Sequence, residues 1–401
     1  MAKLIDITGK ALSGEWGKDD ENGEGIPVIR TTNFTNEGIV NYNNVVKRKI
    51  EKKNIDEKYL RKGDIIIEKS GGSDKFPVGR VVYFDGDENT YLFNNFTGLL
   101  RVKNQDVWYP KYVFYSLFSN YKRGGTRNFE NKTTGLHNLK IDDYVSIYEI
   151  SNINKEEQIY ICKTLDSLYG IIKSRELEIQ LLDELVKARF VEMFGDINVN
   201  DKKWKVQPLG EICSIVRGGS PRPIEKFLGG DIPWIKIGDA TEGESIYLNS
   251  TKEHIIQEGV KKSRLIKKGS LIFANCGVSL GFARIITFDG CIHDGWLAME
   301  NIDKRINKVF MLQSLNQMTE HFRKMAPAGT QPNLNTTIMR EYKQIIPPLD
   351  LQQEYIEFCN KVDKSKVVVF NYIKNVAILL TICSIINENT NGKMGRRLYD
   401  N

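Results

Sequence analysis

Hydrophobic and polar residues follow two different patterns along the chain. Short β-branched runs follow Lys-Gly turns at Asp64–Ile67 and Ser270–Phe273, and each is followed by another such run, Arg80–Phe84 or Ala283–Phe288. Glycine, asparagine and aspartate interrupt these regions about every 8–12 residues, which predicts short strands of an irregular, mostly antiparallel sheet. Each region also has one segment with helical periodicity: Trp108–Tyr121 and Lys308–Met325. We therefore predict two α+β regions.

The second pattern predicts a long helix after each α+β region. From Lys155 to Phe194 there is no proline, and only Gly170 interrupts the run. Apolar residues recur there at alternating steps of three and four, interrupted by Arg175 and Arg189, which is the spacing of a heptad seam. The same spacing returns near the C-terminus, with Ser365 as the polar exception. The seam residues are Ile161, Leu165, Leu168, Ile172, Ile179, Leu182, Val186 and Met193, then Tyr355, Phe358, Val362, Val369, Tyr372, Val376, Leu379, Cys383 and Ile386.

We expect the two long helices to pair with each other as an antiparallel coiled coil. A helix of about 40 residues is about 60 Å long, and a narrow seam of that length cannot be buried against one compact domain. The order domain, helix, domain, helix favours pairing in opposite directions. The alternative is that each helix packs separately on its own domain.

The chain also contains an internal duplication. Ile26–Arg30 returns as Ile232–Lys236, and Lys62–Ile67 returns as Lys268–Phe273, both at an offset of about 206 residues. Further along, two shorter pairs share an offset of about 195 residues: Asn138-Leu139 with Asn333-Leu334, and Glu157-Gln158 with Gln352-Gln353. A period of this length is too long for a solenoid, so each copy should be a domain with its own core.

Composition excludes several classes of protein. The chain has 401 residues, with 57 Lys and Arg against 51 Asp and Glu, so the net charge of +6 permits a polyanionic partner without requiring one. The longest apolar stretches, such as Val367–Phe370 and Val376–Leu380, are far shorter than the roughly 18 residues of a membrane span. Met1–Lys10 has no apolar core of a signal peptide. We therefore expect a cytoplasmic protein.

The cysteines and histidines give no sign of a metal site. None of the 6 Cys is spaced as C-x-x-C, and the 4 His are scattered. A structural zinc site needs four clustered ligands of these types. Reduced, mostly buried thiols are the expectation, and we predict no metal and no cofactor.

Several motifs around the long helices resemble one known family. The first helix ends with Leu181–Leu185 and Phe190–Asp196, similar to the "LDEL…F.EMFGD" ending found after the first target-recognition domain of the DNA specificity (S) subunit of type I restriction–modification systems. Trp204–Ile212 is similar to that family's entry into its second domain. Ile345–Leu349, followed by Gln352–Glu354, is similar to its exit into the second helix.

The resemblance covers nearly the whole chain and gives a fold class and boundaries. The fold class is α+β, with two duplicated mixed α/β target-recognition domains separated by two long helices that form an antiparallel coiled coil. The expected boundaries are residues 1–150 for the first domain, 151–196 for the first spacer helix, 197–348 for the second domain, and 349–401 for the second spacer helix and tail.

The resemblance also implies a function. Each domain would read one half of a split, or bipartite, site on double-stranded DNA, and the helices would hold the domains at a fixed distance. The helices would also dock methylation (M) subunits, two of them, and restriction (R) subunits would join that core. The specificity subunit itself would be non-catalytic, directing adenine methylation or cleavage by its partners in defence against phage.

Two motifs suggest chemistry, and neither is convincing. Gly277–Gly281 fits the G-x-S-x-G nucleophile elbow, with His293-Asp294 nearby, but a β-type run follows where the elbow requires a helix. Asp64, Glu68 and Lys69 resemble nuclease residues, but Glu68 and Lys69 are adjacent and so point to opposite faces of a strand. A solvated strand end is the expectation there. No phosphate-binding loop is found either. With all of these motifs rejected, we predict no catalytic residues.

Polar, glycine-rich loops are the expected DNA-binding segments, because loops on a rigid sheet place side chains and let the backbone approach a ligand closely. Segments 69–75 and 275–279 occupy the same position in the repeat and suit base edges. The basic segments 121–127 and 217–222 suit phosphates. The candidate residues are Lys69, Ser70, Gly71, Gly72, Ser73, Lys75, Arg123, Thr126, Arg127, Arg217, Gly219, Ser220, Arg222, Asn275, Gly277, Ser279, Thr330, Gln331 and Asn333.

Two alternatives remain at this point. One is a non-catalytic coiled-coil adaptor that does not contact DNA, against which the two large domains with polar glycine loops argue. The other is the recognition part of a fused restriction–methylation enzyme, whose catalytic motifs are absent from this chain.

Overall fold

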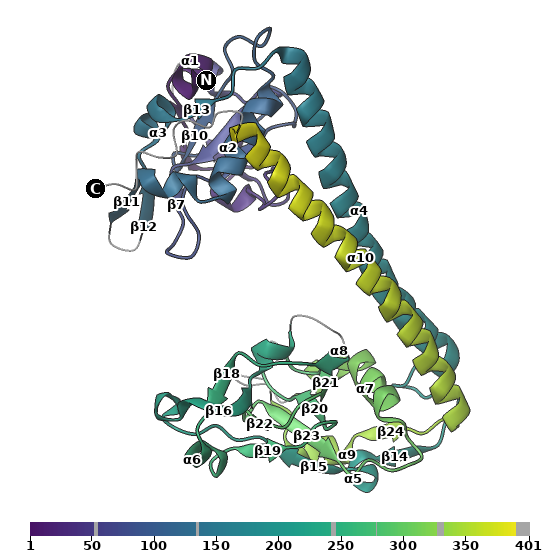
Figure 1. Cartoon of the computed structure of the whole chain (residues 1–401). Helices are drawn as coiled ribbons and strands as arrows, with labels where there is room; N and C mark the ends of the chain where they lie inside the picture. The colour runs from purple at the N-terminus through teal and green to yellow at the C-terminus, as the bar shows by residue number, and fades with distance from the viewer. Residues whose placement is uncertain (52–54, 134–135, 242–245, 278, 327–332, 390–401) are drawn as a thin grey trace. The chain divides into compact units, whose positions relative to one another are not determined.

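The computed structural model describes residues 1–389 apart from 52–54, 134–135, 242–245, 278 and 327–332, and it describes side chains up to residue 376 apart from these gaps and 132–136. The chain divides into two compact units, one formed by Met1–Ser174 with Tyr372–Asn401 and the other by Arg175–Asn371. Each unit contains one α+β region and a part of each long helix (Figure 1).

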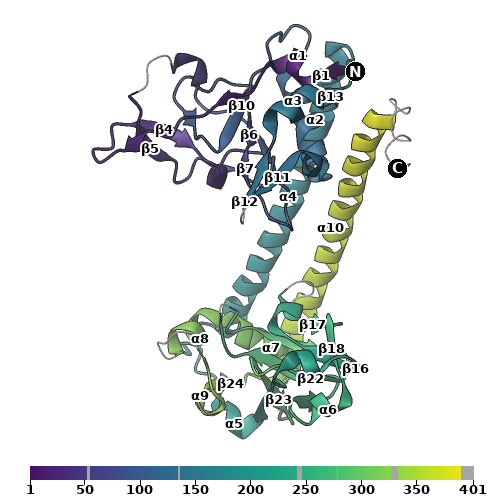
Figure 2. The ribbon, with the colours of Figure 1, turned by 90° about the vertical axis from the view of Figure 1, so that its left-hand side faces the viewer.

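The first unit is built on two four-stranded sheets. The antiparallel sheet has the order β2 (Leu12–Ser13), β10 (Thr97–Leu100), β6 (Ile65–Glu68) and β8 (Val81–Tyr83). The other has the order β3 (Lys18–Asp19), β5 (Val46–Lys49), β4 (Ile26–Ile29) and β9 (Leu92–Phe93), in which β4 and β9 are parallel. Figure 2 shows β4 and β5 on the opposite side of this unit from helices α2 (Pro110–Lys122) and α3 (Ile141–Ile147).

Smaller elements complete the first unit. A three-stranded sheet has the order β11 (Glu130–Thr133), β12 (Leu136–Leu139) and β7 (Ser70–Gly71). The ends of the region are joined by β1 (Ala2–Lys3), which pairs with β13 (Glu149–Ile150) and is followed by α1 (Leu4–Thr8).

The second unit repeats this plan. Its larger sheet has the order β15 (Ser214–Arg217), β23 (Trp296–Glu300), β20 (Leu271–Ala274), β21 (Ala283–Ile286) and β17 (Tyr247–Leu248). Its second sheet has the order β18 (Glu253–Ile255), β16 (Leu228–Ile235), β22 (Gly290–Ile292) and β19 (Arg264–Ile266), with β16 and β22 parallel. The closing ribbon is β14 (Val206–Pro208) with β24 (Lys343–Ile345), and the helices are α5 (Leu209–Ile212), α6 (Gln257–Val260), α7 (Lys308–Gln317), α8 (Thr319–Met325) and α9 (Thr336–Glu341).

The duplication extends to single hydrogen bonds. After β4, the amide of Arg30 donates to Asn33 Oδ1 at 3.0 Å, and after β16 the amide of Lys236 donates to Asp239 Oδ2 at 2.8 Å. At each entry to a long helix a fully buried glutamine makes the same contacts: its Nε2 donates to two backbone carbonyls, and its Oε1 accepts one backbone amide. These residues are Gln158 and Gln352. The predicted duplication is confirmed, although the sequence pairing of Glu157-Gln158 with Gln352-Gln353 was wrong by one residue.

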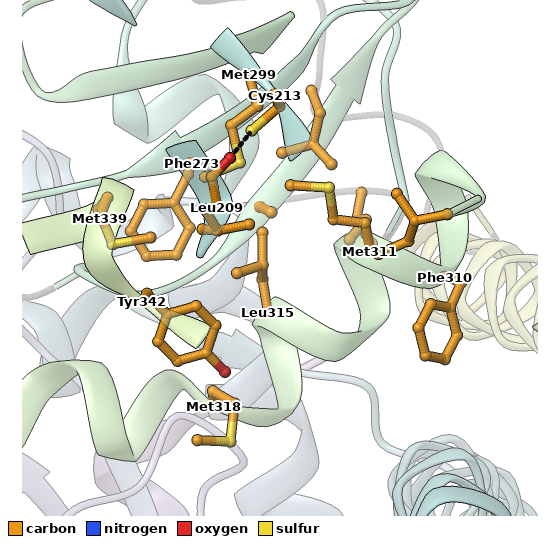
Figure 3. Close-up of a cluster of buried hydrophobic side chains, with 14 of the residues drawn as sticks. Leu209, Cys213, Phe273, Met299, Phe310, Met311, Leu315, Met318, Met339 and Tyr342 are labelled. Atoms are coloured by element: carbon orange, nitrogen blue, oxygen red, sulfur yellow. Dashed lines mark hydrogen bonds between the residues drawn. The ribbon is translucent and has the colours of Figure 1, made fainter. Parts of the chain in front are cut away.

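The central strand of each unit is buried on both faces. In the second unit Leu271 and Phe273 face one cluster of buried side chains, while Ile272 and Ala274 face another. Figure 3 shows the first of these clusters, in which side chains of α5, α7 and the turn after α9 surround Phe273. Burial on both faces explains why these strands are continuous apolar runs rather than alternating ones.

The predicted long helices are α4 (Lys155–Phe194) and α10 (Leu349–Asn389). Their segments within the second unit run antiparallel, because Arg189 pairs with Glu354 at 2.7 Å and Asp183 pairs with Lys366 at 2.6 Å. Tyr355 is fully buried against α4 and its hydroxyl donates to the Val186 carbonyl at 3.3 Å. The predicted antiparallel pairing is confirmed for these segments.

The register of the seam on α10 differs from the prediction at three positions. Cys359 and Lys366 are buried, whereas the predicted Ser365 is exposed and Tyr372 is 45% exposed. The predicted Phe358 is half-buried, beneath the guanidinium of Arg189. Both registers have steps of three and four, so the spacing alone could not separate them. Lys366 fits the seam because its aliphatic stem packs while its ammonium reaches Asp183.

Candidate nucleic-acid interface

In the first unit, two of the predicted DNA-binding loops and one neighbouring loop meet at the end of β6. The amide of Lys69 donates to the Phe96 carbonyl at 2.8 Å, and the amide of Leu139 donates to the Lys69 carbonyl at 2.8 Å. Arg127 Nη2 donates to the carbonyls of Asp74 and Lys75 at 3.2 and 3.3 Å. The segments 69–76, 94–96 and 121–127 therefore form one structure, which we call the first loop cluster.

The first loop cluster carries exposed cations and close-packed glycines. Lys75 and Arg127 are exposed, as are Gly72 and Ser73. Gly71 has φ +152°, and a Cβ there would lie 2.5 Å from Glu68 Oε1, so glycine is required at this turn. The exposed cations give the cluster a surface that attracts phosphates.

Two residues of the first loop cluster are held away from solvent. Thr126 is 0% exposed and packs against Gly79, where a Cβ would lie 2.8 Å from Thr126 Cγ2. Its expected role as a DNA contact is corrected to a packing role, because its side chain has no exposed surface. Lys69 is half-buried, its Nζ donates to Ser13 Oγ at 2.8 Å, and burial together with the charge of Lys58 lowers its pKa.

Ser70 and Arg123 complete the candidates in this unit. Ser70 lies opposite Asn138 in the pairing of β7 with β12, and their side chains are hydrogen bonded. Arg123 is exposed at the end of α2, and its Nε donates back to the Ser119 carbonyl at 3.4 Å. Ser70 is half-buried, so it shapes the turn before Gly71 and presents only part of its side chain.

The strand end below this cluster is not solvated, contrary to expectation. Glu68 is 4% exposed, and its Oε1 accepts from Arg80 Nη2 at 3.2 Å. Arg80 also donates to the carbonyls of Thr31 and Phe34. Burial raises the pKa of Glu68, and the charge and hydrogen bond of Arg80 oppose that rise. The pair is structural, because both partners are occupied within the protein.

In the second unit, a single carboxylate organises the basic loop 217–222. Asp294 Oδ1 accepts from Ser220 Oγ at 2.9 Å, and its Oδ2 lies 3.5 Å from Arg222 Nη2. The Asp294 carbonyl accepts from Arg217 Nε at 3.1 Å. The amide of Gly219 donates to the Ile292 carbonyl at 3.0 Å, which holds the loop against β22.

His293 and Asp294 interact directly, and the surrounding loop shifts the pKa of each side chain. His293 Nδ1 accepts from the Gly295 amide at 2.9 Å, so its Nε2 can donate to Asp294 Oδ1 at 3.0 Å. Burial is the main cause that lowers the pKa of His293, and Arg222 and Arg217 add to it. The pKa of Asp294 is lowered although burial opposes this, because Ser220, His293 and the two arginines stabilise its charge. Near neutral pH, Asp294 is therefore an anion surrounded by basic side chains.

The segment 275–279 is attached to the same place. The amide of Asn275 donates to the Gly295 carbonyl at 3.0 Å, and Cys276 forms a β-bridge with Asn333. Gly277 adopts φ +72°, which favours glycine, and is partly exposed, as is Ser279. The segments 217–222, 275–277 and 293–295, with Ser279 and Asn333, form the second loop cluster.

Asn275 does not occupy the role expected of it. It is 0% exposed, and its Nδ2 donates to Asn333 Oδ1 at 3.1 Å and to the Leu334 carbonyl at 3.2 Å. A side chain without exposed surface cannot offer an edge to a base, so Asn275 is corrected to a residue that positions the loop. Asn333 is half-buried and holds the other side of the same contact. Thr330 and Gln331 lie outside the described residues.

Both clusters also contain exposed or charged residues that were not among the predicted DNA contacts. His293 and Asp294 were weighed only as parts of a hydrolase, and that motif is followed by strand β21, as predicted, and not by a helix. Phe76 and Phe96 of the first loop cluster are 59% and 51% exposed. Large apolar side chains in a glycine-rich polar loop are the signal that could have identified both phenylalanines.

The described residues contain no group of three or more His, Cys, Asp or Glu that could hold a metal ion. Among the helices of the described part of the chain, none combines the length and the apolar character needed to cross a membrane.

Comparison with known proteins gives a consistent answer. The model of the type I restriction modification DNA specificity domain matches residues 2–183 and 201–375. The type I restriction enzyme MjaIX specificity subunit of Methanocaldococcus jannaschii is 24% identical over 176 residues, which are 42% of this chain and 40% of that protein. The matched part is thus well under two thirds of that relative's length.

Two solved structures share the fold. A chain from work on complex assembly and conformational transition of the type I R-M system has a TM-score of 0.62 at 13% identity, with 96% of both chains covered. The crystal structure of a type I restriction–modification S subunit from M. genitalium has a TM-score of 0.50 at 16% identity, with 96% of this chain and 94% of that chain covered. Since the family match covers both α+β regions and a part of each long helix, this chain belongs to the type I restriction–modification DNA specificity domain family.

Proposed function

We propose that this chain is the specificity subunit of a type I restriction–modification complex and that it recognises a bipartite sequence on double-stranded DNA. The observation that carries the proposal is the presence of two copies of one fold, each with a loop cluster of exposed cations and glycine turns at the same position. The reading domains correspond to residues 1–150 and 197–348, and the spacers to 151–196 and 349–401. Each domain would read one half of the site.

Within each cluster, different residues suit different parts of the duplex. The exposed guanidinium groups of Arg123, Arg127, Arg217 and Arg222 suit phosphates, which fix the register of a protein on DNA. Gly72, Ser73, Gly277 and Ser279 suit base edges, because small residues let the backbone approach and a hydroxyl both donates and accepts. Asp294 would hold the second set of cations in place.

The long helices have surface for partners. On α4, Leu177, Leu181 and Leu185 follow one another at steps of four and are 54, 54 and 47% exposed. On α10, Val367, Val368 and Phe370 are more than half exposed. Contiguous exposed apolar side chains favour a protein interface. We assign these faces to two methylation subunits, and restriction subunits would join that core. The partners would catalyse adenine methylation or cleavage in the cytoplasm. This chain would hold no cofactor.

The test is DNA binding by the purified chain with and without a type I methylation subunit. The chain alone should bind weakly and with little selectivity, because a net charge of +6 neutralises few phosphates. Addition of the methylation subunit should give specific binding in a gel shift. Tight, specific binding by the isolated chain at physiological salt would contradict this division of the interface.

A variant pair tests the docking face. Leu177→Glu with Leu181→Glu should abolish co-purification of the methylation subunit, because both charges would be buried in the interface. The control is Glu176→Ala with Glu184→Ala, two exposed positions on the same helix. Equal loss of assembly in both pairs, or none in the leucine pair, would refute the assignment.

A further inference from the structure

The first unit has a basic cleft at the end of its central sheet opposite the first loop cluster. Its volume is about 880 Å³, and it lies where β6 begins and β10 ends. The first loop cluster lies at the other end of β6, and a strand of four residues separates the two ends by about 13 Å. The turns around Gly9, Lys62 and Asn104 form its walls, and Leu12, Leu99 and Val102 contribute apolar surface.

The charge of the cleft is strongly positive. Five cationic side chains line it, against two carboxylates: Lys10, Arg61, Lys62, Arg101 and Lys103, with Asp64 and Asp106. Asp64 is 2% exposed and is already occupied, because Arg101 donates to both of its oxygens, at 2.8 and 2.7 Å, and the Arg61 amide donates to it at 2.7 Å. The side chains of the remaining four cations have no carboxylate within ion-pair distance among the described residues, although the backbone amide of Lys62 donates to Glu88 Oε1 at 3.2 Å.

The second unit provides an internal comparison, because two of the cations at its matching corner are paired. There Lys267 pairs with Asp289 at 2.8 Å and Arg305 pairs with Asp303 at 2.6 Å. Glu300 directly follows Met299, which pairs with the first residue of β20, just as Arg101 directly follows Leu100, which pairs with the first residue of β6. Among the described residues, the side chains of Lys268 and Lys304 at that corner have no carboxylate within ion-pair distance, so the second unit leaves two cations unpaired where the first leaves four.

We propose that this cleft binds a small anion that carries several phosphate groups. Unpaired like charges in one cleft repel each other, and a bound polyanion removes that cost. Lysine and arginine are the side chains that bind phosphates. The volume lies in the range of about 300–1,000 Å³ that is typical of small-molecule sites. A duplex that contacts the first loop cluster has no need of this cleft, so the site is independent of DNA reading.

The experiment is calorimetric titration of the full chain with inorganic tripolyphosphate. We expect one equivalent to bind, and Lys62→Ala with Lys103→Ala to weaken binding at least tenfold, since each lysine supplies a charge to the cleft. The matched control is Lys268→Ala with Lys304→Ala, two exposed lysines at the matching corner of the second unit, which should leave the affinity unchanged. All four lysines are exposed, so thermal unfolding should be unchanged in both variants.

Four results would overturn the proposal. Three of them are no binding to the wild-type chain, equal weakening by both lysine pairs, and tighter binding of a hexaglutamate peptide than of tripolyphosphate. Displacement of tripolyphosphate by duplex DNA would also overturn it, by assigning the cleft to the DNA backbone. The methylated sequence in cells should be the same for both lysine pairs, so failure of the DNA-reading proposal would appear in that assay and leave the titration unaffected.

Discussion

The two domains share a backbone but differ in the chemistry at the end of the central strand. In the first domain the amide of Glu68 donates to the Arg80 carbonyl at 2.8 Å, and the two side chains form an ion pair in which the carboxylate is buried. In the second domain the amide of Ala274 donates to the Phe282 carbonyl at 2.8 Å, and Phe282 packs edge-on against Trp296 with ring centroids 5.5 Å apart. The same strand pairing is thus stabilised by charge in one copy and by aromatic packing in the other.

The adjacent turn differs in the opposite sense, with an aromatic side chain in the first domain and a charge in the second. The amides of Asn94 and His293 donate to equivalent strand carbonyls, so Asn94–Phe96 and His293–Gly295 are matching turns. The first turn presents an exposed phenylalanine, and the second presents Asp294, which binds the basic loop. The shared fold therefore determines where the loops lie, whereas their side chains differ between the two copies. Recognition of two different half-sites would require this.

The largest expected effect comes from breaking the buried ion pair. Arg80→Met should destabilise the chain by about 3–5 kcal/mol, because Glu68 would be left charged and buried. The double variant Glu68→Ala with Arg80→Phe copies the second domain and should recover part of the loss. Urea unfolding of all three proteins measures this. An Arg80→Met protein as stable as wild type would show that the pair has no structural role.

The same variant should depend on pH in a defined direction. The pKa of Glu68 is raised in the folded protein by burial, and loss of Arg80 should raise it further. The folded state then binds the proton more tightly than the unfolded state, so stability is favoured below the unfolded pKa and is lost as pH rises through the folded pKa. The penalty of Arg80→Met should therefore shrink on acidification from pH 7 to pH 4.5. A constant penalty would contradict burial of the charged carboxylate.

The next effect concerns Asp294 in the second loop cluster. Asp294→Ala should release Ser220 and Arg222, and we expect discrimination at one half-site to fall by about 1–3 kcal/mol, the value of a well-placed base contact. Non-specific affinity should rise, because a negative charge leaves the interface. Sequencing of methylated sites in cells measures the motif, with Asp289→Ala as control. A changed motif in the control, or an unchanged one in Asp294→Ala, would refute the role.

A smaller effect is expected for the exposed cation of the same loop. The Arg222 side chain is 82% exposed, so Arg222→Ala should weaken binding about equally on all sequences and reduce the slope of log K against log salt by about 1. Arg222→Lys should restore most of the slope, because a phosphate contact needs the charge. A sequence-dependent loss would instead make Arg222 a base contact.

The smallest effect distinguishes the first loop cluster from the second. Phe96→Ala should alter only the half-site read by the first domain, by roughly 1 kcal/mol, because phenylalanine makes apolar contact with thymine methyl groups in the major groove. Replacing thymine by uracil in that half-site should reproduce the loss and not add to it. Additive losses would separate Phe96 from the methyl groups.

The sequence predicted the fold well because its signals were long. A heptad spacing over about 40 residues and a duplication over about 200 accumulate evidence that no single loop can give. The predicted seam passed through Ser365 because its position satisfies the spacing, but the position of Lys366 satisfies it too. Lys366 is the buried residue, and its partner Asp183 lies on the other helix. Most candidate segments do lie together within each unit, whereas their contact with DNA stays a prediction. Individual roles failed at Thr126 and Asn275, because burial depends on tertiary contacts that a local pattern does not contain.

The most direct test of two readers separated by a helical spacer is a matched insertion of one heptad in each long helix. Seven residues after Glu184 and seven after Asn360 lie between the Asp183–Lys366 and Arg189–Glu354 pairs, so the seam stays in register on both sides. Each insertion adds about 10 Å. Sequencing of methylated sites should show two unchanged half-sites separated by a gap about three base pairs longer, at about 3.4 Å per base pair. An unchanged gap, or new half-site sequences, would contradict the account.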